Sequence, residues 1–362
     1  MKAPDAFTDN FSAVIAHLLE GRIVVTGAAG FIGSALVWAL NRQGVEDIIV
    51  CDRLDESEKW KNLAPLRFAD YIDADDLIDL VECDAQALGD VRFLFHLGAC
   101  SSTTERDSQY LLRNNYEYTK RIVRWALDRG VRTVYASSAA TYGLLELCSD
   151  EEPLERLRPL NMYAYSKQMF DCYAAREGWL DRLVGLKYFN VFGPNEWHKG
   201  EMRSVVCKAF EQIACGGTVN LFRSHRPEFT DGGQQRDFIY VKDAVAMTLA
   251  LAQAPLAHGI YNVGSGRAST WLELIEPVFA ALGLPPKISF VDMPEDLRHA
   301  YQYRTQATLG RLAGAGYACN VPPLAGAVQD YVRFYLQPHR RLDPAQPDHY
   351  LQSVTAAARA SA

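Results

Sequence analysis

The sequence predicts an α/β protein with a doubly wound parallel sheet and a smaller C-terminal domain, and three observations favour that fold class. From residue 23 to about 190, short β-branched runs alternate with segments of helical periodicity, as repeated βαβ units require. The first run, IVVTGAAGFIG at 23–33, leads through glycines into an apolar helix. After Phe189 the chain is broken by Gly193-Pro194-Asn195 and the polar stretch 224–236, which indicates a second domain.

The elements of the chain follow from the same patterns. An N-terminal extension, 1–22, has apolar residues at helical spacing, which predict a short amphipathic helix (Phe11, Val14, Ile15, Leu18 and Leu19). Strands of the sheet are expected at 23–26, 48–51, 79–83, 92–97, 132–137 and 183–189, and two further strands, at 237–241 and 259–264, return to it. The first domain is therefore expected at 23–190 and 237–264, the second at 191–236 and 265–336, and a mobile tail at 337–362.

Composition excludes several classes of protein. With 362 residues and 49% hydrophobic content the chain can bury more than one small core, so it is not of the disordered class. The net charge of −7 is spread without a basic block, which argues against nucleic acid as the partner. The eight cysteines form no metal-ligand pattern, so we expect no metal site and buried thiols in a reducing compartment. Acidic residues interrupt the N-terminus, and no apolar run could span a membrane, which favours the cytoplasm.

The glycine pattern predicts a dinucleotide site. Glycines at Gly27, Gly30 and Gly33 allow a tight turn, close approach of a pyrophosphate and packing of the helix on the strand. The phosphates would lie at the N-terminus of the helix that starts near Phe31. The next strand ends in Asp52, close to the spacing of an acid that binds the ribose. An ordinary βα turn is the alternative, and the strand–turn–helix context argues against it.

A second group of residues predicts hydride chemistry at an alcohol carbon. Tyr163 and Lys167 are four residues apart in NMYAYSK, which places both side chains on one face of a helix, and Ser138 follows an earlier strand. Ser138 can hydrogen-bond the substrate oxygen, Tyr163 can exchange its proton, and Lys167 can hold the cofactor ribose and stabilise the phenolate. For work near pH 7 the tyrosine pKa must fall by about 3 units, which a nearby ammonium favours. A surface pair is the alternative for Tyr163 and Lys167.

These motifs, taken with several others, resemble a known family. The chain carries GACSSTTE at 98–105, Asn114-Asn115-Tyr116, SSAATYG at 137–143, YFNVFGP at 188–194 and HKG at 198–200. From about Ile23 to about Tyr335 the sequence is similar to the ADP-glyceromanno-heptose 6-epimerases, which are extended short-chain dehydrogenases/reductases with a Rossmann-like fold.

The resemblance implies an isomerase that inverts C6 of the heptose in ADP-D-glycero-D-manno-heptose, for the lipopolysaccharide inner core. A tightly bound cofactor removes hydride from C6 and returns it to the other face. The two acid/base roles fall on Tyr163 and on Lys199 of HKG, with Ser138 and Lys167 in support; a solvated loop lysine is the alternative for Lys199. The family forms homo-oligomers, often pentamers, so we expect an oligomer here.

The resemblance also implies two sets of binding residues. Cations near Asp52 favour NADP, with NAD left open; the expected cofactor contacts are Gly27, Gly30, Phe31, Ile32, Gly33, Asp52, Arg53, Lys59, Leu97, Gly98, Ala99, Cys100, Ser101, Asn114, Lys167 and Val191. The expected contacts to the ADP-heptose are Asn190, Glu201, Lys208, Phe222, Arg223, Ser224, His225, Arg236 and Tyr301. Of these, Arg236 suits a diphosphate on its own chemistry, because its guanidinium is a planar fork of donors. Glu201, Lys208, Ala74 and Leu97 depart from the family pattern.

Two alternatives stay open at this point. A UDP-hexose 4-epimerase or a nucleotide-sugar dehydratase keeps the fold and changes the substrate, although a dehydratase would need an acidic pair where this chain has Ala139 and Ala140. A non-catalytic NADP sensor would bind the dinucleotide without needing Ser138, Tyr163 and Lys167.

Overall fold

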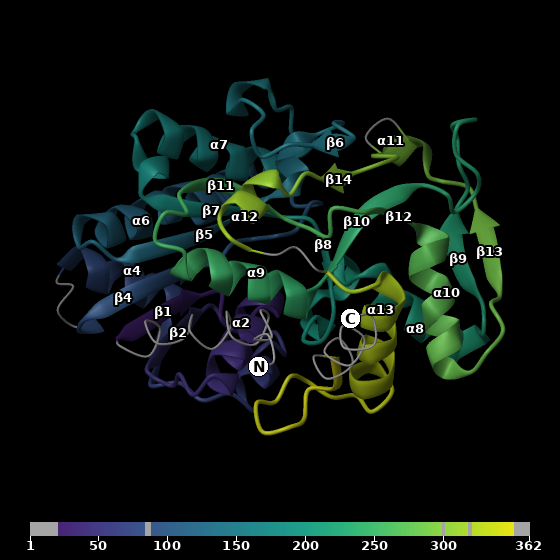
Figure 1. Cartoon of the computed structure of the whole chain (residues 1–362), viewed down its shortest axis with the longest axis horizontal. Coiled ribbons are helices and arrows are strands. Elements are labelled where there is room, and N and C mark those ends of the chain that lie inside the picture. The colour runs from purple at the N-terminus through teal and green to yellow at the C-terminus, as the bar shows by residue number, and fades with distance from the viewer. Residues whose placement is uncertain (1–20, 84–87, 299–300, 318–320, 351–362) are drawn as a thin grey trace, which may run out of the picture.

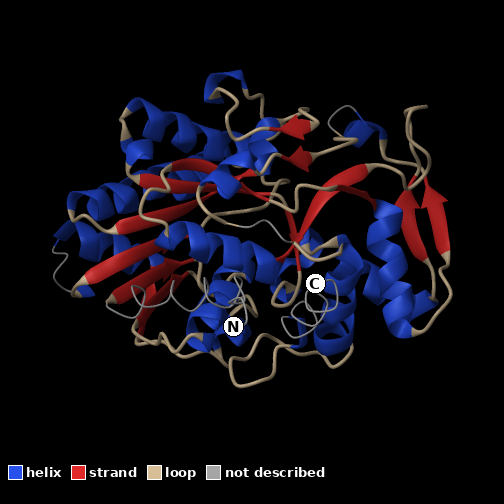
Figure 2. Cartoon of the chain, in the orientation of Figure 1, coloured by secondary structure: helices blue, strands red, loops and turns tan. Residues whose placement is uncertain are grey.

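The computed structural model describes residues 21–83, 88–298, 301–317 and 321–350 (Figure 1). The amphipathic helix expected within 1–22 therefore lies outside the described residues. A large sheet with helices on both faces occupies one side of the molecule, and a smaller group of strands and helices occupies the other (Figure 2).

The large sheet is parallel throughout and has seven strands within the described residues. Its order is β11-β7-β5-β4-β1-β2-β3, so consecutive strands diverge to either side of the neighbours β1 and β4. In such sheets the crevice at the carboxyl ends of the two diverging strands is where ligands bind. The strands are β1 (Arg22–Thr26), β2 (Ile48–Asp52), β3 (Asp70–Asp73), β4 (Val91–His96), β5 (Arg132–Ser138), β7 (Leu183–Tyr188) and β11 (Gly259–Val263).

Two layers of helices cover this sheet. On one face α2 (Phe31–Arg42) and α9 (Val241–Gln253) bury apolar side chains with the strands, and on the other α4 (Ala74–Cys83), α6 (Tyr118–Asp128) and α7 (Met162–Arg176) do so. Near-continuous apolar strands are expected for a parallel sheet that is buried on both faces, and β1, β2 and β7 fit that description. Short helices are α3 (Trp60–Leu63), α5 (Ser108–Leu111), α11 (Glu295–Arg298) and α12 (Gly310–Gly314).

One expected strand is wrong. Residues 79–83 belong to helix α4, and the third strand is the preceding segment DYID, β3. Leu77, Ile78 and Val81 are buried at helical spacing in α4, and a short apolar run of this kind cannot be assigned to strand or helix from periodicity alone. β3 lies at the edge of the sheet and is mostly polar, which is why its sequence gave no strand signal.

The smaller part of the molecule continues from the large sheet. β8 (Asn190–Phe192), β10 (Gln235–Tyr240) and β12 (Ala268–Thr270) form one sheet, β9 (Val219–Phe222) pairs with β13 (Ile288–Val291), and β6 (Leu147–Cys148) pairs with β14 (Gln306–Ala307). α8 (Val205–Gly216), α10 (Trp271–Leu282) and α13 (Leu324–Tyr331) pack beside them. Of the two strands expected to return to the first domain, β11 joins the large sheet and β10 does not.

The described part of the expected mobile tail is packed. Leu342, Asp348 and Tyr350 are buried, and Asp348 accepts a hydrogen bond of 2.6 Å from Lys242, which also contacts Asp330 at 3.1 Å. A buried ammonium and two buried carboxylates are tolerated only when they pair, so this cluster ties the segment 337–350 to α9 and α13. The expectation of mobility is therefore wrong for these residues.

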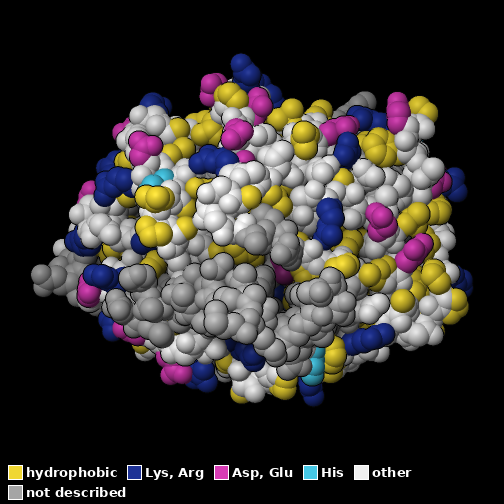
Figure 3. Space-filling model, in the orientation of Figure 1, with side chains coloured by type: hydrophobic (Ala, Val, Ile, Leu, Met, Phe, Trp, Pro, Cys, Tyr) yellow, Lys and Arg dark blue, Asp and Glu magenta, His cyan; other side chains and the backbone are white. Residues whose placement is uncertain are grey.

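The surface of the described residues is mixed. Basic and acidic side chains alternate over the face shown in Figure 3. Among the helices that the structure describes, none combines the length and the apolar character needed to cross a bilayer.

Candidate active site

A cavity of about 640 Å³ opens at the carboxyl ends of β1, β4 and β5, where the strand order reverses. It collects residues from segments far apart in the chain: the glycine loop, the turn after β4, the end of β5, α7, β8 and the segment that contains HKG. The residues that matter below are Gly27, Phe31, Asp52, Lys59, Gly98, Ser138, Tyr163, Lys167, Asn190, His198, Lys199 and Trp271.

The glycine loop has the geometry of a phosphate cradle. Gly27 has φ +69°, and a Cβ atom there would lie 2.7 Å from the backbone of Gly98. A Cβ atom at Gly33 would lie 2.0 Å from the carbonyl oxygen of Gly27. Helix α2 starts without a side-chain cap at Gly30 and has no acidic residue in its first turn, so its N–H groups and positive dipole end face the cavity. These residues fit a dinucleotide pyrophosphate.

Asp52 at the end of β2 is held from three sides. Its carboxylate accepts hydrogen bonds from the backbone N–H of Ala29 at 2.9 Å and of Arg53 at 2.8 Å, and it pairs with the ammonium of Lys59 at 2.8 Å. The guanidinium of Arg53 binds Asn114 and pairs with Asp75 at 2.6 Å. Asp52, Arg53, Lys59 and Asn114 line a small adjoining cavity of about 110 Å³. The cofactor set expected from the sequence is thus gathered in two adjacent hollows.

The turn after β4 is fixed by two buried polar side chains that the sequence did not single out. Thr26 accepts from the N–H of Gly98 at 3.1 Å and contacts His96 at 2.7 Å. Asn115 accepts from the N–H of Cys100 at 2.8 Å and donates to the carbonyl of Cys100 at 3.0 Å. Sequence reasoning assigned a role to Asn114 and not to its fully buried neighbour. The only signal in the sequence was the Asn-Asn pair itself.

Tyr163, Lys167 and Ser138 lie together on the cavity wall. Asn161 caps α7 through the N–H of Ala164 at 2.8 Å, and the helix then presents Tyr163 and Lys167 on the same face. Lys167 donates to the carbonyl of Ala136 at 2.9 Å, and Tyr163 is hydrogen-bonded to Ser138. The adjacent Tyr165 points away and is 49% exposed.

The pKa values of the pair follow from burial. Burial raises the pKa of Tyr163, and the hydrogen bond with Ser138 opposes that rise, so the phenol is protonated in this state. This differs from the expected fall because burial disfavours the phenolate, and the Lys167 ammonium donates to the carbonyl of Ala136 and not to Tyr163. Burial lowers the pKa of Lys167 to about 8, with the charge of Asp171 opposing that shift.

Lys199 is brought to the same cavity from the other side. Its ammonium lies 5.3 Å from the centre of the Phe31 ring, at the start of α2. Burial lowers the pKa of Lys199, with the negative charge of Glu196 opposing the shift. Its neighbour His198 contacts Asn62 at 3.2 Å, and burial together with the charge of Lys199 lowers the pKa of His198 to about 4. Lys199 is therefore not the solvated loop lysine of the alternative interpretation.

Arg236, expected from the sequence to contact the sugar nucleotide, is packed among aromatic side chains. Its guanidinium lies 5.0 Å from the ring centre of Tyr301 and 5.8 Å from that of Trp271, and the Trp271 indole donates to the Tyr301 hydroxyl at 3.0 Å. Phe222 stacks edge-on against Tyr301. Arg236 lies on strand β10 and is 7% exposed, although the sequence analysis included it in the polar stretch 224–236. Phe238 lies two residues on and lines the cavity, and Arg236 is on the same face of β10, but Arg236 is not itself among the lining residues.

Of the expected substrate residues, only Asn190 is among those that line the cavity; the expected cofactor contact Val191 lines it too. The lining does not include the other expected substrate residues, Glu201, Lys208, Phe222, Arg223, Ser224, His225, Arg236 and Tyr301. Lys208 pairs with Glu201 at 3.1 Å on the surface, so each satisfies the other. The chain also contributes lining residues that sequence reasoning missed, namely Met202, Arg203, Ser204, Val205, Trp271 and Leu274.

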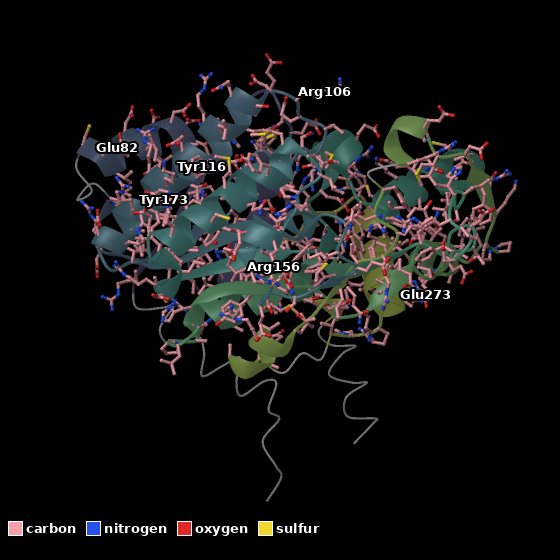
Figure 4. The ribbon with its side chains drawn as sticks, turned by 90° about the horizontal axis from the view of Figure 1, so that it is seen from above. Glu82, Arg106, Tyr116, Arg156, Tyr173 and Glu273 are labelled. Carbon is pink, nitrogen blue, oxygen red and sulfur yellow. The ribbon has the colours of Figure 1, made fainter. Side chains whose placement is uncertain are left out.

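A second hollow of about 750 Å³ lies on the other side of α7 and shares no lining residue with the cavity described above. Tyr116 and Tyr173, which line it, lie next to each other in Figure 4 with ring centres 6.1 Å apart, while Glu273 at the start of α10 lies at the far end of the molecule. Three tyrosines line this hollow, Tyr116, Tyr165 and Tyr173, but among the described residues no lysine or serine lines it with them. Among the described residues there is no group of three or more His, Cys, Asp or Glu side chains that could hold a metal ion.

Comparisons with known proteins agree with this geometry. The model of the NAD dependent epimerase/dehydratase family matches residues 23–264 and implies an NAD(P) cofactor. The chain is 51% identical over 315 residues to the ADP-L-glycero-D-manno-heptose-6-epimerase of Nitratidesulfovibrio vulgaris strain Hildenborough, covering 86% of this chain and 97% of that one. It is 40% identical to the enzyme of the same name from Fusobacterium nucleatum, covering 91% of this chain and 100% of that one.

A solved structure shows the same likeness. The crystal structure of Helicobacter pylori ADP-L-glycero-D-manno-heptose-6-epimerase superposes with a TM-score of 0.73 at 26% identity, covering 90% of this chain and 98% of that chain. The glycine loop, the Ser-Tyr-Lys group and these matches agree, and the chain belongs to the NAD dependent epimerase/dehydratase family and, within it, to the ADP-L-glycero-D-manno-heptose-6-epimerases.

Proposed function

We propose that this protein inverts C6 of the heptose in ADP-D-glycero-β-D-manno-heptose, giving the L-glycero form used for the lipopolysaccharide inner core. The observation that carries the proposal is the convergence of Tyr163 and Lys199 on one cavity from α7 and from the segment after β8. Where two groups share the acid/base work of inversion, one must act from each side of the reacting carbon, and Tyr163 and Lys199 are placed for that.

Tyr163, Ser138 and Lys167 serve one face of the sugar. Tyr163 exchanges the proton of the C6 hydroxyl, and Ser138 hydrogen-bonds the same oxygen. The protonated phenol is ready to act as the acid when the ketone is reduced. Lys167, with its lowered pKa of about 8, remains largely an ammonium at pH 7 and favours the phenolate when Tyr163 acts as the base.

Lys199 serves the other face. A lysine with an ordinary pKa near 10.4 is a poor base at neutral pH, and the burial of Lys199 shifts its pKa in the direction that base catalysis needs. The negative charge of the nearby Glu196 opposes that shift and limits how far the pKa of Lys199 falls. Glu196 is held in place by a hydrogen bond of 2.6 Å that it accepts from Ser204 Oγ.

The cofactor is proposed to be NADP, held between the glycine loop, Asp52 and Lys59. When bound, it supplies the transient oxidation of C6 and the reduction that follows, without net redox change. The Asp52 carboxylate is already occupied by Lys59 and two backbone N–H groups. Lys59 and Arg53, which pair with Asp52 and Asp75, are two cations beside the small cavity, and a 2′-phosphate would attract both. NAD, which would bind Asp52 through a 2′-hydroxyl, is the competing cofactor.

Arg236 is proposed to bind the ADP diphosphate. Its guanidinium is buried and lies over two aromatic rings. Among the described residues, no carboxylate forms an ion pair with it. Burial lowers the pKa of Arg236, but a guanidinium remains charged, so the site presents a fixed cation.

We further propose a cytoplasmic homo-oligomer, with a pentamer as the expected form. Free thiols at the described cysteines suit a reducing compartment. The exposed apolar side chains of Leu144, Leu147, Leu160 and Tyr165, between 38% and 63% exposed, suit burial between subunits. Light scattering of the purified protein measures the number of subunits directly.

The proposal is tested by turnover. Purified protein is incubated with ADP-D-glycero-β-D-manno-heptose without added cofactor, and the C6 epimers are followed by NMR. Wild type should convert the substrate, whereas Tyr163→Phe and Lys199→Met should lose at least about 100-fold in rate with the dinucleotide still bound. Tyr165→Phe, two residues away and exposed, is the matched control and should keep full activity.

Two outcomes would overturn the proposal. If the wild-type protein carries its dinucleotide and converts no ADP-heptose, the proposed substrate is wrong, and UDP-hexoses are then tested as substrates. Full activity of Lys199→Met favours a single-base scheme like that of a 4-epimerase. The dinucleotide released on denaturation, identified by mass, decides between NADP and NAD.

A further inference from the structure

The segment that carries Lys199 is connected to the glycine loop through one buried amide. Asn62 is 1% exposed, and its Nδ2 lies 3.0 Å from the carbonyl oxygen of Ala29, 3.0 Å from that of Asn195 and 3.2 Å from His198 Nδ1. Its Oδ1 accepts a hydrogen bond of 3.2 Å from Arg341 Nε. One side chain therefore links the dinucleotide loop, the HKG segment and the C-terminal segment.

The C-terminal segment also contacts the HKG segment directly. The N–H of Leu342 donates to Asn195 Oδ1 at 3.0 Å, and Asn195 Nδ2 donates to Ser34 Oγ in α2 at 2.9 Å. The rings of Trp197 and His339 lie 4.6 Å apart. Asn195 has φ +78°, in the left-handed region that asparagine adopts more readily than most residues, and its two side-chain hydrogen bonds hold it there.

The far end of the C-terminal segment is anchored to the large domain. The carbonyl of Gln346 accepts from Arg42 at 2.8 Å, and Tyr350 donates to Asp243 at 2.7 Å. The buried pair of Lys242 and Asp348 lies between them in the same region. Residues 338–350, which we name the strap, are thus fixed on α2 and α9 at one end and reach the HKG segment at the other.

We propose that the strap positions Lys199, with Arg341 and Asn62 as the positioning residues that hold the HKG segment against the glycine loop. This rests on the proposed function, in which Lys199 is the second acid/base. The family model ends at residue 264, so the strap lies outside the part of the chain that this model matches. Without the contacts of Arg341 and Leu342, we expect the HKG segment to be held less firmly against the glycine loop and Lys199 to move away from the Phe31 ring toward solvent.

The test compares Arg341→Met with Arg340→Met. Arg340 is adjacent and exposed, and among the described residues its side chain forms no hydrogen bond or ion pair, so it is the matched control. We expect Arg341→Met to lower kcat about tenfold with KM and bound dinucleotide unchanged, because a catalytic group displaced by about 1 Å can cost about 100-fold. Arg341→Lys, which retains a donor, should recover part of the loss, and Arg340→Met should match wild type.

A second measurement separates positioning from a general loss of structure. In a Lys199→Met background, Arg341→Met should change the residual rate by less than about twofold, since the group that it positions is gone. Additive losses in the double variant, or wild-type kcat in Arg341→Met, overturn the proposal.

A third measurement needs no substrate and keeps the proposal testable if the proposed function fails. The reactivity of each lysine toward acetic anhydride is followed against pH by peptide mass spectrometry, which reports the pKa of the Lys199 amine in the intact protein. In wild type the pKa of Lys199 should be low, and in Arg341→Met it should rise toward the ordinary value, with the reactivity of the exposed Lys287 as the internal reference. An unchanged Lys199 profile overturns the strap's role, whereas a shifted profile in a protein that does not epimerise the heptose refutes the proposed function alone.

Discussion

His96 at the end of β4 is predicted to make the protein sensitive to mild acid. The ring is fully buried between two hydroxyls, with Nδ1 2.7 Å from Thr26 Oγ1 and Nε2 2.9 Å from Thr119 Oγ1. Thr119 donates its proton to the carbonyl of Asn115 at 2.7 Å, so it can only accept from His96, and Nε2 carries the hydrogen. Nδ1 then accepts from Thr26, and a second ring proton would oppose the Thr26 hydroxyl.

The size of the effect follows from the pKa. Burial lowers the pKa of His96 from 6.5 to about 3, with the charge of Lys167 adding to the shift. Above about pH 6.5 the histidine is neutral in both states and contributes nothing. As the pH falls below that value, His96 binds a proton in the unfolded chain but not in the folded chain. The free energy of unfolding therefore falls by about 1.4 kcal/mol per pH unit. The loss is about 2 kcal/mol at pH 5 and reaches about 5 kcal/mol near pH 3.

The assay is a comparison of wild type with His96→Gln, which can donate and accept at the same positions but does not titrate. The free energy of unfolding is measured by urea at matched pH values, and the difference between the two proteins is plotted against pH. We expect the difference to grow in favour of the variant below about pH 6.5 with the slope given above. Other groups, such as Asp237 with its pKa raised to about 6 by burial, contribute equally to both proteins and cancel.

A flat difference between pH 7 and 5 would refute this reasoning, as would a carbon-13 histidine spectrum in which His96 titrates near its ordinary pKa. Either result would mean that the ring is hydrated or that its hydroxyl neighbours rearrange to accept a second proton.

Two other predictions follow from the packing. Gly33→Ala should weaken dinucleotide binding by more than about tenfold, because its Cβ would lie 2.0 Å from the carbonyl oxygen of Gly27 and the phosphate loop would have to move; titration of the apoprotein measures this, and unchanged affinity would show that the loop adapts. Lys242→Met should lower the free energy of unfolding by about 3–5 kcal/mol, because it leaves two buried carboxylates, Asp330 and Asp348, without their cation; a loss below about 1 kcal/mol would show that they become protonated at little cost.

Local sequence patterns predicted much of the fold correctly. The strands at β1, β2, β4, β5 and β7 were predicted to within a residue or two, since their apolar runs are buried on both faces of a parallel sheet. β3 was missed because an edge strand needs no apolar run. The third strand was instead predicted at 79–83, which belongs to α4. Arg236 was included in the polar stretch 224–236 because glycines and polar residues precede it, although strand β10 already begins at Gln235.

The packed segment 337–350 shows a different limit. Its sequence, rich in proline, charge and polar residues, has no periodicity, and its order comes from single long-range contacts such as Lys242 with Asp348 and Arg341 with Asn62. Contacts between residues separated by 106 and 279 positions leave no local pattern, so neither could be predicted from neighbouring residues.

The sequence by itself determined the chemistry available to this protein: a glycine loop for a dinucleotide, a Tyr-Lys pair at helical spacing, a serine before it and a lysine in HKG. Those properties depend on residue type and short spacing, which the covalent chain specifies directly. Only the tertiary structure decided that Lys199 reaches the cavity of Tyr163, that Asn62 and the strap hold it there, and that Lys208 and Glu201 pair on the surface away from it. Those outcomes depend on burial and on distances between remote segments, which are set when the parallel sheet brings the ends of its strands to one edge.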